Sequence, residues 1–439
     1  MSEELFPIAA SWNVTTLSQL CSGNDASIQT GPFGTALHAA DYVDEGIPCV
    51  MPQDIRDGRV STANIAKITP EDHQRLKGYH LRVGDIVYPR RGDIVKRALI
   101  TERESGWLCG TGCLRIRPNL DEVDPRFLSY YLAHPDVCAW IESNAVGATM
   151  PHLNTGLAGS IPVVSPPLPE QREIAGILGA LDDKIELNRR MAATLEEMAR
   201  SLYRSWFVNF DPVHAKAAGH PPAHMDPATA ALFPDRFGDD GLPEGWRMGP
   251  VSDLFDILMG QSPPGDTYND VGIGLPFFQG RTDFGFRFPT RRKFCSAPTR
   301  IAARDTVLLS VRAPVGDLNR AWEVCCIGRG VASLAEKNGY NAYGYEALWS
   351  LSEELKAYDG EGTVFGSINR KQLADLSLAL PPQPLREAFQ NAVGSMDDRI
   401  RNIESQNQTL ATLRDSLLPR LMSGELRVGA ARAQVEEVA

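Results

Sequence analysis

Two short stretches of the chain concentrate basic side chains that could bind an anionic partner. Residues 80–117 contain eight Arg or Lys against four Asp or Glu, and residues 281–320 contain nine against three. Arginine forms forked hydrogen bonds to phosphate oxygens and to base edges, so these two basic islands favour contact with a nucleic acid. The formal net charge of −11 argues against such a partner only as a sum, because the acids concentrate elsewhere, notably in residues 170–199. A merely solvated surface is the alternative interpretation.

The residue patterns of common catalytic and metal sites are missing. The chain has no Gly-Lys dipeptide for a phosphate-binding loop and no Asn/Asp-Pro-Pro-aromatic sequence of an amino-methyltransferase. Asp182, Asp183 and Lys184 resemble a nuclease cluster, but adjacent positions diverge around a helix, so a solvated helix face is preferred. Buried thiols in strands are likewise preferred to a zinc site, whose ligands would be Cys109, Cys113, His134 and Cys138. The sequence therefore predicts neither a catalytic nor a metal site.

A long internal repeat sets the organisation of the chain. Pro166-Pro167 recurs as Pro381-Pro382, and Asp182-Asp183 recurs as Asp397-Asp398, each shifted by 215 residues (381 − 166 and 397 − 182). Such a repeat predicts two similar units related by a pseudo-two-fold, and such a protein suits a two-part target.

A long helix is predicted after each proline pair, because the apolar positions then alternate in steps of three and four. This narrow stripe is typical of a coiled coil, and Asn188 and Asn407 each occupy one slot, where a polar residue fixes register. Each helix should span about 35–40 residues, roughly 55 Å at 1.5 Å per residue. We expect the two copies to pair antiparallel. The stripe consists of Ile174, Leu178, Leu181, Ile185, Ala192, Leu195, Ala199 and Leu202, and then of Val393, Met396, Ile400, Ile403, Leu410, Leu417 and Leu421.

The predicted fold class is α+β, with two tandem α/β domains separated by two long antiparallel helices. The first domain should cover residues 1–165 and the second residues 246–380, with the helices at 166–210 and 381–426. Residues 211–245 are rich in Pro, Gly, His and Ala and form a linker or an irregular packed excursion, and the tail 427–439 should be frayed. Amphipathic helices are expected over 125–138 and 345–358. The glycines at 31, 34, 260 and 265 should satisfy turn dihedrals.

Composition places the chain in a reducing, aqueous compartment. No apolar targeting segment follows the acidic start, and no run of about 18 apolar residues occurs, so a cytoplasmic protein that does not cross a membrane is expected. The eight dispersed cysteines should be reduced and mostly buried.

At this point the sequence resembles one known family, the specificity (S) subunit of type I restriction–modification systems. Its central conserved helix is similar to Pro-Pro-Leu-Pro-Glu-Gln-Arg-Glu-Ile-Ala at 166–175 and its continuation at 181–188. Residues 205–213, 417–426, 260–268, 310–316 and 327–330 are similar to other family segments, in the right order over nearly the whole chain. Two departures suggest that the half-sites differ. The second helix begins without the fuller phrase of the first, and residues 88–92 do not reproduce the Arg-Ala-Pro-Val-Gly of 312–316.

The resemblance implies a non-catalytic subunit whose two target-recognition domains read two parts of a double-stranded DNA target, with the helices acting as a ruler. It also implies two DNA-methyltransferase (M) subunits docked on the chain and optional motor-nuclease (R) subunits. No cofactor is then expected in this chain. S-adenosylmethionine, and ATP with Mg²⁺ where a motor is present, belong to the partner subunits.

The residues expected to contact DNA fall into two tiers. For any one arginine an exposed salt bridge is the alternative, and for a lone histidine a loop hydrogen bond. The first tier is basic and consists of Arg90, Arg91, Lys96, Arg97, Arg281, Arg291, Arg292, Lys293 and Arg312. The second tier lies in loops ahead of helices and consists of Thr149, His152, Asn154, Ser367 and Asn369.

The outer faces of the long helices are hypothesised to dock the methyltransferase subunits, with a merely solvated face as the alternative. The residues are Asp182, Asp183, Lys184, Glu186, Arg189, Asp397 and Asp398. A coiled-coil scaffold that binds proteins without DNA readout is the competing function, favoured by the acidic net charge. Salt separates the two, because phosphate contacts weaken steeply as ionic strength rises.

Overall fold

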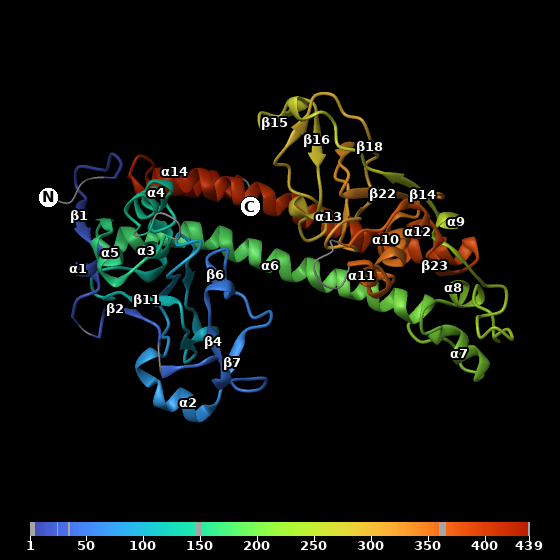
Figure 1. The fold of residues 1–439 in the computed structure, drawn as a ribbon, viewed down its shortest axis with the longest axis horizontal. Helices are drawn as coiled ribbons and strands as arrows, with labels where there is room; N and C mark the ends of the chain where they lie inside the picture. The colour runs from blue at the N-terminus through green and yellow to red at the C-terminus, as the bar shows by residue number, and fades with distance from the viewer. Residues whose placement is uncertain are drawn as a thin grey trace. The chain divides into compact units, whose positions relative to one another are not determined.

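A computed structural model describes residues 5–23, 25–33, 36–145, 147, 151–359 and 366–437. The chain divides into two compact units, which are unit 1 (Met1–Leu187 and Gln406–Ala439) and unit 2 (Asn188–Ser405). Each unit contains one globular α+β domain and one half of each of two long helices (Figure 1). The predicted fold class is confirmed.

The long helices are α6 (Leu168–Phe207) and α13 (Gln383–Met422), each of 40 residues. They begin 215 residues apart (383 − 168) and also end 215 residues apart, so the sequence repeat is preserved as a structural repeat. Both lie inside the predicted ranges, two residues after the start of each proline pair, as expected for rings that suit a first turn. At 1.5 Å per residue each helix is about 60 Å long.

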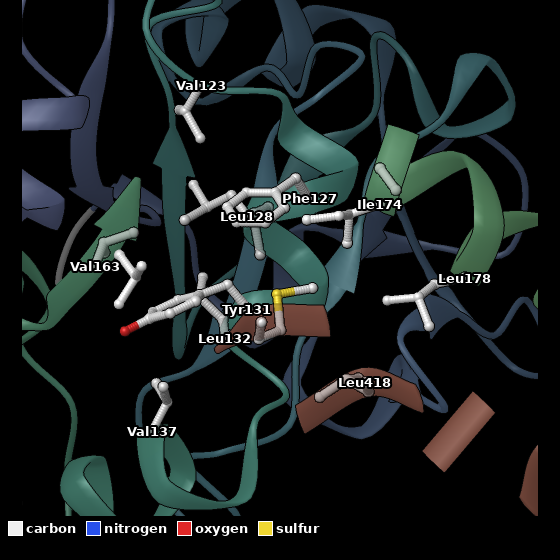
Figure 2. Close-up of a cluster of buried hydrophobic side chains, with 14 of the residues drawn as sticks. Val123, Phe127, Leu128, Tyr131, Leu132, Val137, Val163, Ile174, Leu178 and Leu418 are labelled. Atoms are coloured by element: carbon white, nitrogen blue, oxygen red, sulfur yellow. The ribbon is translucent and has the colours of Figure 1, made fainter. Parts of the chain in front are cut away.

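The two helices pair antiparallel in each unit. In unit 1, Arg414 of α13 binds Asp182 of α6 at 2.7 Å, and Ile174 and Leu178 of α6 lie in one core with Leu418 of α13 (Figure 2). In unit 2, Met191 contacts Arg399, and further along α6 the ring of Tyr203 meets that of Phe389. Residue numbers therefore rise along one helix as they fall along the other. Most of the predicted stripe is buried, and so is Asn188, at 2% exposure.

The domain of unit 1 is built from three small sheets and short helices. The sheet orders are β1-β12, β2-β11-β8-β9 and β10-β4-β7-β3, with a β5-β6 hairpin. The strands are β1 Asn13–Thr16, β2 Ser27–Thr30, β3 Tyr42–Val43, β4 Ile47–Val50, β5 Ile55–Arg56, β6 Arg59–Val60, β7 Ala66–Ile68, β8 Ile86–Pro89, β9 Ala98–Leu99, β10 Leu108–Cys109, β11 Cys113–Arg117 and β12 Pro162–Ser165. The helices are α1 Leu17–Leu20, α2 Pro70–Arg75, α3 Pro125–Tyr131, α4 Pro135–Asn144, α5 Thr155–Ser160 and α14 Val428–Glu436.

The domain of unit 2 repeats this topology. Its sheets are β13-β23, β14-β22-β19-β20 and β15-β17-β16-β21-β18, and the parallel pair β4/β10 of unit 1 corresponds to β16/β21. The strands are β13 Arg247–Pro250, β14 Phe255–Met259, β15 Tyr268–Asn269, β16 Leu275–Phe278, β17 Phe294–Cys295, β18 Ile301–Ala302, β19 Val307–Ser310, β20 Leu318–Arg320, β21 Cys325–Ile327, β22 Val331–Glu336 and β23 Ser377–Leu380. The helices are α7 Asp211–Ala217, α8 Pro227–Ala231, α9 Val251–Leu254, α10 Asn341–Trp349, α11 Ser352–Lys356 and α12 Arg370–Asp375.

Each domain is attached to the helices through its core. In unit 1, Phe127, Leu128 and Tyr131 of α3 pack beside Ile174 and Leu178 of α6 (Figure 2). Tyr131 also donates a hydrogen bond to the Pro162 carbonyl at 2.9 Å. In unit 2, an aromatic cluster of Tyr203, Trp206 and Phe207 on α6 packs around Phe389 of α13.

Four expectations about local structure are corrected. Residues 211–245 contain α7 and α8 and are a packed excursion rather than an open linker, because Val213 and Phe233 are buried in the core of unit 2. The tail is not frayed over its described part, since it forms α14 and buries Ala431 in unit 1. The helix expected over 125–138 is split at Pro135, which begins α4, and that over 345–358 is split into α10 and α11.

Within the described residues, no helix is both long and apolar enough to cross a bilayer. In the same part of the chain, no three His, Cys, Asp or Glu side chains are arranged to hold a metal ion. The eight cysteines are free thiols, and all but Cys138 are buried. Burial raises the pKa of Cys109 to about 12, so that thiol stays protonated.

Candidate nucleic-acid interface

Backbone hydrogen bonds join five loops of unit 2 at one edge of its domain. Gly260, after β14, donates to Val331 at 2.9 Å, and Gly328 donates to Phe278 at 2.9 Å. The remaining links run from Val311 to Gly330 at 3.0 Å and from Ile368 to Val311 at 3.1 Å. The loops after β14, β16, β19 and β21 and the segment before α12 therefore form one connected surface.

The same loops are joined in the same way in unit 1. Gly31 donates to Cys113 at 2.9 Å, Gly110 donates to Val50 at 2.9 Å, Arg90 donates to Gly112 at 2.7 Å, and Leu153 donates to Arg90 at 2.9 Å. Because each bond has its counterpart in unit 2, the loops can be aligned residue by residue without any sequence similarity. We call the two sets loop cluster 1 (in unit 1) and loop cluster 2 (in unit 2).

Two glycines allow the loops to approach closely. A Cβ atom on Gly31 would lie 2.1 Å from the Gly110 carbonyl oxygen, and one on Gly260 would lie 2.2 Å from that of Gly328. Neither glycine has a positive φ, so the turn-dihedral expectation was wrong for both, and steric room is the reason for glycine. Gly265 also lacks a positive φ and has open space around it, whereas Gly34 lies outside the described residues.

Arg91 and Arg312 occupy equivalent positions in the two clusters. Arg91 forms an isolated antiparallel bridge with His152, and Arg312 forms one with Ser367. Both arginines are exposed, and within the described residues neither has an ion pair. The two sequence phrases that seemed unrelated therefore present one arginine at the same place.

The other basic candidates of unit 1 are engaged within the domain. Arg90 is half-buried, Lys96 pairs with Asp93 at 3.1 Å, and the Arg97 guanidinium donates to the Ser129 carbonyl at 2.5 Å. Contact with DNA stays a prediction for all three.

Four basic candidates of unit 2 form exposed ion pairs, as the salt-bridge alternative anticipated. Their side chains are about half exposed, and pairs of that kind contribute little stability, so a phosphate could compete for the cation. The pairs are Arg281 with Asp317 at 2.8 Å, Arg291 with Glu323 at 2.5 Å, Arg292 with Asp283 at 2.5 Å and Lys293 with Asp270 at 2.7 Å.

Two second-tier candidates serve as helix caps. The Asn154 side chain accepts a hydrogen bond from the Leu157 amide at 2.8 Å, and that of Asn369 accepts one from the Gln372 amide at 3.0 Å. Their amide nitrogens are not used in these caps. Thr149 lies outside the described residues.

Several arginines counted in the basic islands are not available to a ligand. Arg115 is 5% exposed and donates to the carbonyls of Gly78 and His80, both at 3.2 Å. Arg287 and Arg320 are 2% and 5% exposed and bind acids of unit 2, and burial lowers the pKa of Arg320 to about 10. Local charge in the sequence therefore overstates the charge at the surface.

The helix residues proposed to dock a partner have different surroundings. Asp182 accepts from Tyr130 at 2.6 Å and from Arg414, while Asp183 is 57% exposed and pairs with Arg126 at 2.9 Å. Lys184, Arg189 and Asp398 are exposed, and Glu186 is half-buried. Burial, reinforced by the Asp182 carboxylate, raises the pKa of the Tyr130 hydroxyl, which therefore remains a donor.

Asp397 does not lie on an outer face. It is 6% exposed, and its carboxylate binds Arg287 at 2.7 Å and also Arg320. The expected outer position was wrong, because this side of α13 packs against the domain of unit 2.

Exposed side chains that the candidate lists omit also lie in the clusters. Gln279, Arg329 and the half-buried Ser262 lie in loop cluster 2, and Phe33, 64% exposed, lies in loop cluster 1. The family-like segments 260–268 and 327–330 contain two of them, and that was the available signal.

Comparisons with known proteins point to one family. Residues 34–197 match the type I restriction modification DNA specificity domain. The chain is 26% identical over 393 residues to a protein of Methanocaldococcus jannaschii named as a type I restriction enzyme MjaX specificity subunit, covering 87% of this chain and 88% of that one. It is 24% identical over 408 residues to the type I restriction enzyme HindI specificity subunit of Haemophilus influenzae, covering 79% and 87%.

A solved structure shows the same fold. The type I restriction–modification system S subunit from M. genitalium is 17% identical, and the match covers 94% of this chain and 96% of that one with a TM-score of 0.53. The resemblance drawn from the sequence is therefore confirmed by the family and its curated relatives.

Proposed function

We propose that this chain, a relative of the type I restriction enzyme specificity subunits, is a non-catalytic subunit that recognises a two-part sequence in double-stranded DNA. The observation that carries the proposal is the repetition of one loop cluster in both units, each with an exposed arginine at the same position. Phosphate contacts would come from the basic side chains around each cluster, and base contacts from the side chains within it.

A two-part target with an unread spacer follows from the repeat. One domain in each unit would read one short sequence, and the helix pair would set the distance between them. A helix of about 60 Å corresponds to between one and two turns of duplex DNA.

The helices would also bind the methyltransferase subunits, and motor-nuclease subunits could join that assembly. S-adenosylmethionine, and ATP with Mg²⁺ where a motor is present, would then be held by the partners. The exposed Asp183, Lys184, Arg189 and Asp398 support a polar docking face. Asp398→Lys should reduce co-purification of the partner, whereas Glu197→Lys, an exposed acid elsewhere on α6, is the matched control. Full recovery with both variants would exclude this face at Asp398.

The test of DNA recognition is the salt dependence of binding. The chain in complex with its methyltransferase subunits is titrated with duplex DNA at several salt concentrations. Replacing Arg91 or Arg312 by Gln should each weaken binding and, where the arginine neutralises a phosphate, reduce the slope of log affinity against log salt by about 1. Arg236→Gln, which removes an exposed arginine outside both clusters, should leave the slope unchanged. Binding that is weak and insensitive to salt would instead support a protein scaffold without DNA readout.

A further inference from the structure

The residue that follows β16 in unit 2 matches the one that follows β4 in unit 1. These residues are Gln279 and Met51, and each comes directly after the carbonyl that accepts the bond from Gly328 or Gly110. A Cβ atom on Gly328 would lie 2.7 Å from Gln279 Oε1, and one on Gly110 would lie 2.6 Å from Met51 Sδ. The two side chains therefore lie over the same glycine in their clusters.

The neighbours of Gln279 are polar. Its Nε2 donates to Ser262 Oγ at 2.9 Å, and the Arg329 amide donates to the same oxygen at 3.4 Å. The side chains of Gln279 and Arg329 are exposed, and within the described residues Arg329 has no ion pair. An amide already oriented by a hydroxyl stands beside a cationic fork, with Arg312 on the adjoining loop.

The matching positions in unit 1 are mostly apolar. The backbone bonds align Ser262 with Phe33 and Arg329 with Thr111. Phe33 is 64% exposed, and Met51 is half-buried and accepts from the Tyr42 hydroxyl at 3.7 Å. Loop cluster 1 therefore presents an aromatic ring and a thioether where loop cluster 2 presents an amide and a guanidinium.

We infer that the two units read bases by different chemistry, with Gln279 and Arg329 as specificity-determining residues of unit 2 and Phe33 and Met51 as those of unit 1. Gln pairs with the N6 and N7 of adenine, and Arg with the O6 and N7 of guanine, so the unit 2 half-site contains purines read by hydrogen bonds. Apolar side chains contact the thymine methyl group, so the unit 1 half-site contains a thymine read by contact. This inference rests on the proposed function, since it assigns the chemistry of the same two clusters.

The experiment sequences modified bases in DNA from cells that express the chain with its methyltransferase subunits. The unit 2 variant carries Gln279→Met and Arg329→Thr, which installs the unit 1 residues, and the unit 1 variant is Phe33→Ser. We expect the first to relax one half of the methylated sequence and the second to relax the other, with discrimination at the affected base falling roughly 5- to 150-fold. Arg236→Thr is the matched control and should leave both halves unchanged.

A single isosteric variant guards against a folding failure. Gln279→Glu keeps the shape of the side chain but replaces its donor by an acceptor, so preference should move from adenine towards cytosine, whose N4 donates. Melting temperature and co-purification with the partner establish that each variant is folded. A wild-type two-part sequence that stays unchanged in all three variants would overturn the inference and leave the proposed function standing. A wild-type chain that directs no methylated sequence would overturn the proposed function and the inference with it.

Discussion

The sharpest stability test is the removal of Arg287, which lies at the centre of a buried polar network in unit 2. Its side chain is 2% exposed and contacts Glu196 of α6 at 3.3 Å, Glu346 of α10 at 3.4 Å and Asp397 of α13 at 2.7 Å. The guanidinium also stacks over the Tyr345 ring at 3.5 Å. Replacing it by Met keeps much of the volume but leaves buried carboxylates without their shared cation.

The expected loss is large because the remaining charges stay buried. Removing one partner of a buried ion pair typically costs about 3–5 kcal/mol. For a unit of this size each kcal/mol moves the melting temperature by about 2–4 °C, so Arg287→Met should lower it by roughly 6–20 °C. Urea unfolding at pH 7.5 measures the free energy of unfolding, and differential scanning calorimetry measures the melting temperature.

Two controls separate the charge effect from a general effect of substitution. Arg236→Met removes a surface arginine, 70% exposed and paired with Glu244, and should leave both measurements nearly unchanged. Adding Asp397→Leu to Arg287→Met removes one of the stranded acids and should restore part of the loss. If Arg287→Met is no more destabilising than Arg236→Met, the network does not stabilise unit 2 and the reasoning fails.

Three further predictions concern single side chains. Burial raises the pKa of Glu346 from 4.5 to about 7, so its protonated form favours folding and that stability is lost as pH rises through 7. Relative to Glu346→Gln, the wild type should therefore lose on the order of 3 kcal/mol of unfolding free energy between pH 5 and 8, and a constant difference would contradict the assignment. Gly260→Ala places a Cβ 2.2 Å from a backbone oxygen and should destabilise by about 1–3 kcal/mol, whereas Gly265→Ala has open space and should melt like the wild type. Asn369→Ala removes the cap of α12 and should cost about 1 kcal/mol in urea unfolding, a loss that Asn369→Asp avoids if capping is the cause.

The long helices were predictable because their signal is long and occurs twice. The apolar stripe recurs at a constant shift of 215 residues, and the helices observed are shifted by the same number. The short helices of the tail and of residues 211–245 have too few turns for a clear period, and tertiary packing of Ala431 and Val213 fixes them. Pro135 could have been used to split the helix over 125–138, because its ring suits a first turn and not an interior one.

The site was predictable only in part, because counting charge along the sequence does not show which charges are buried. The islands contain Arg312, which is exposed in loop cluster 2, and also Arg287, which is almost fully buried. Gln279 and Arg329 come from separate loops that the sheet order brings together, and no local pattern predicts that meeting. The equivalence of Arg91 and Arg312 appears only in the backbone bridges, since the residues around them differ.

The two units also differ in how the domain is held on the helices. By the shift of 215 residues, Asp397 corresponds to Asp182, and Glu196 corresponds to Ala411. Unit 1 therefore lacks the acid that binds Arg287 in unit 2, and Asp182 instead accepts from Tyr130 and Arg414 at a site that is about a quarter exposed. Solvent screens that site, whereas the network around Arg287 is dry and requires several groups at fixed positions. A change in the attachment of the domain should thus cost more in unit 2 than in unit 1, because only in unit 2 does it leave buried charges unpaired.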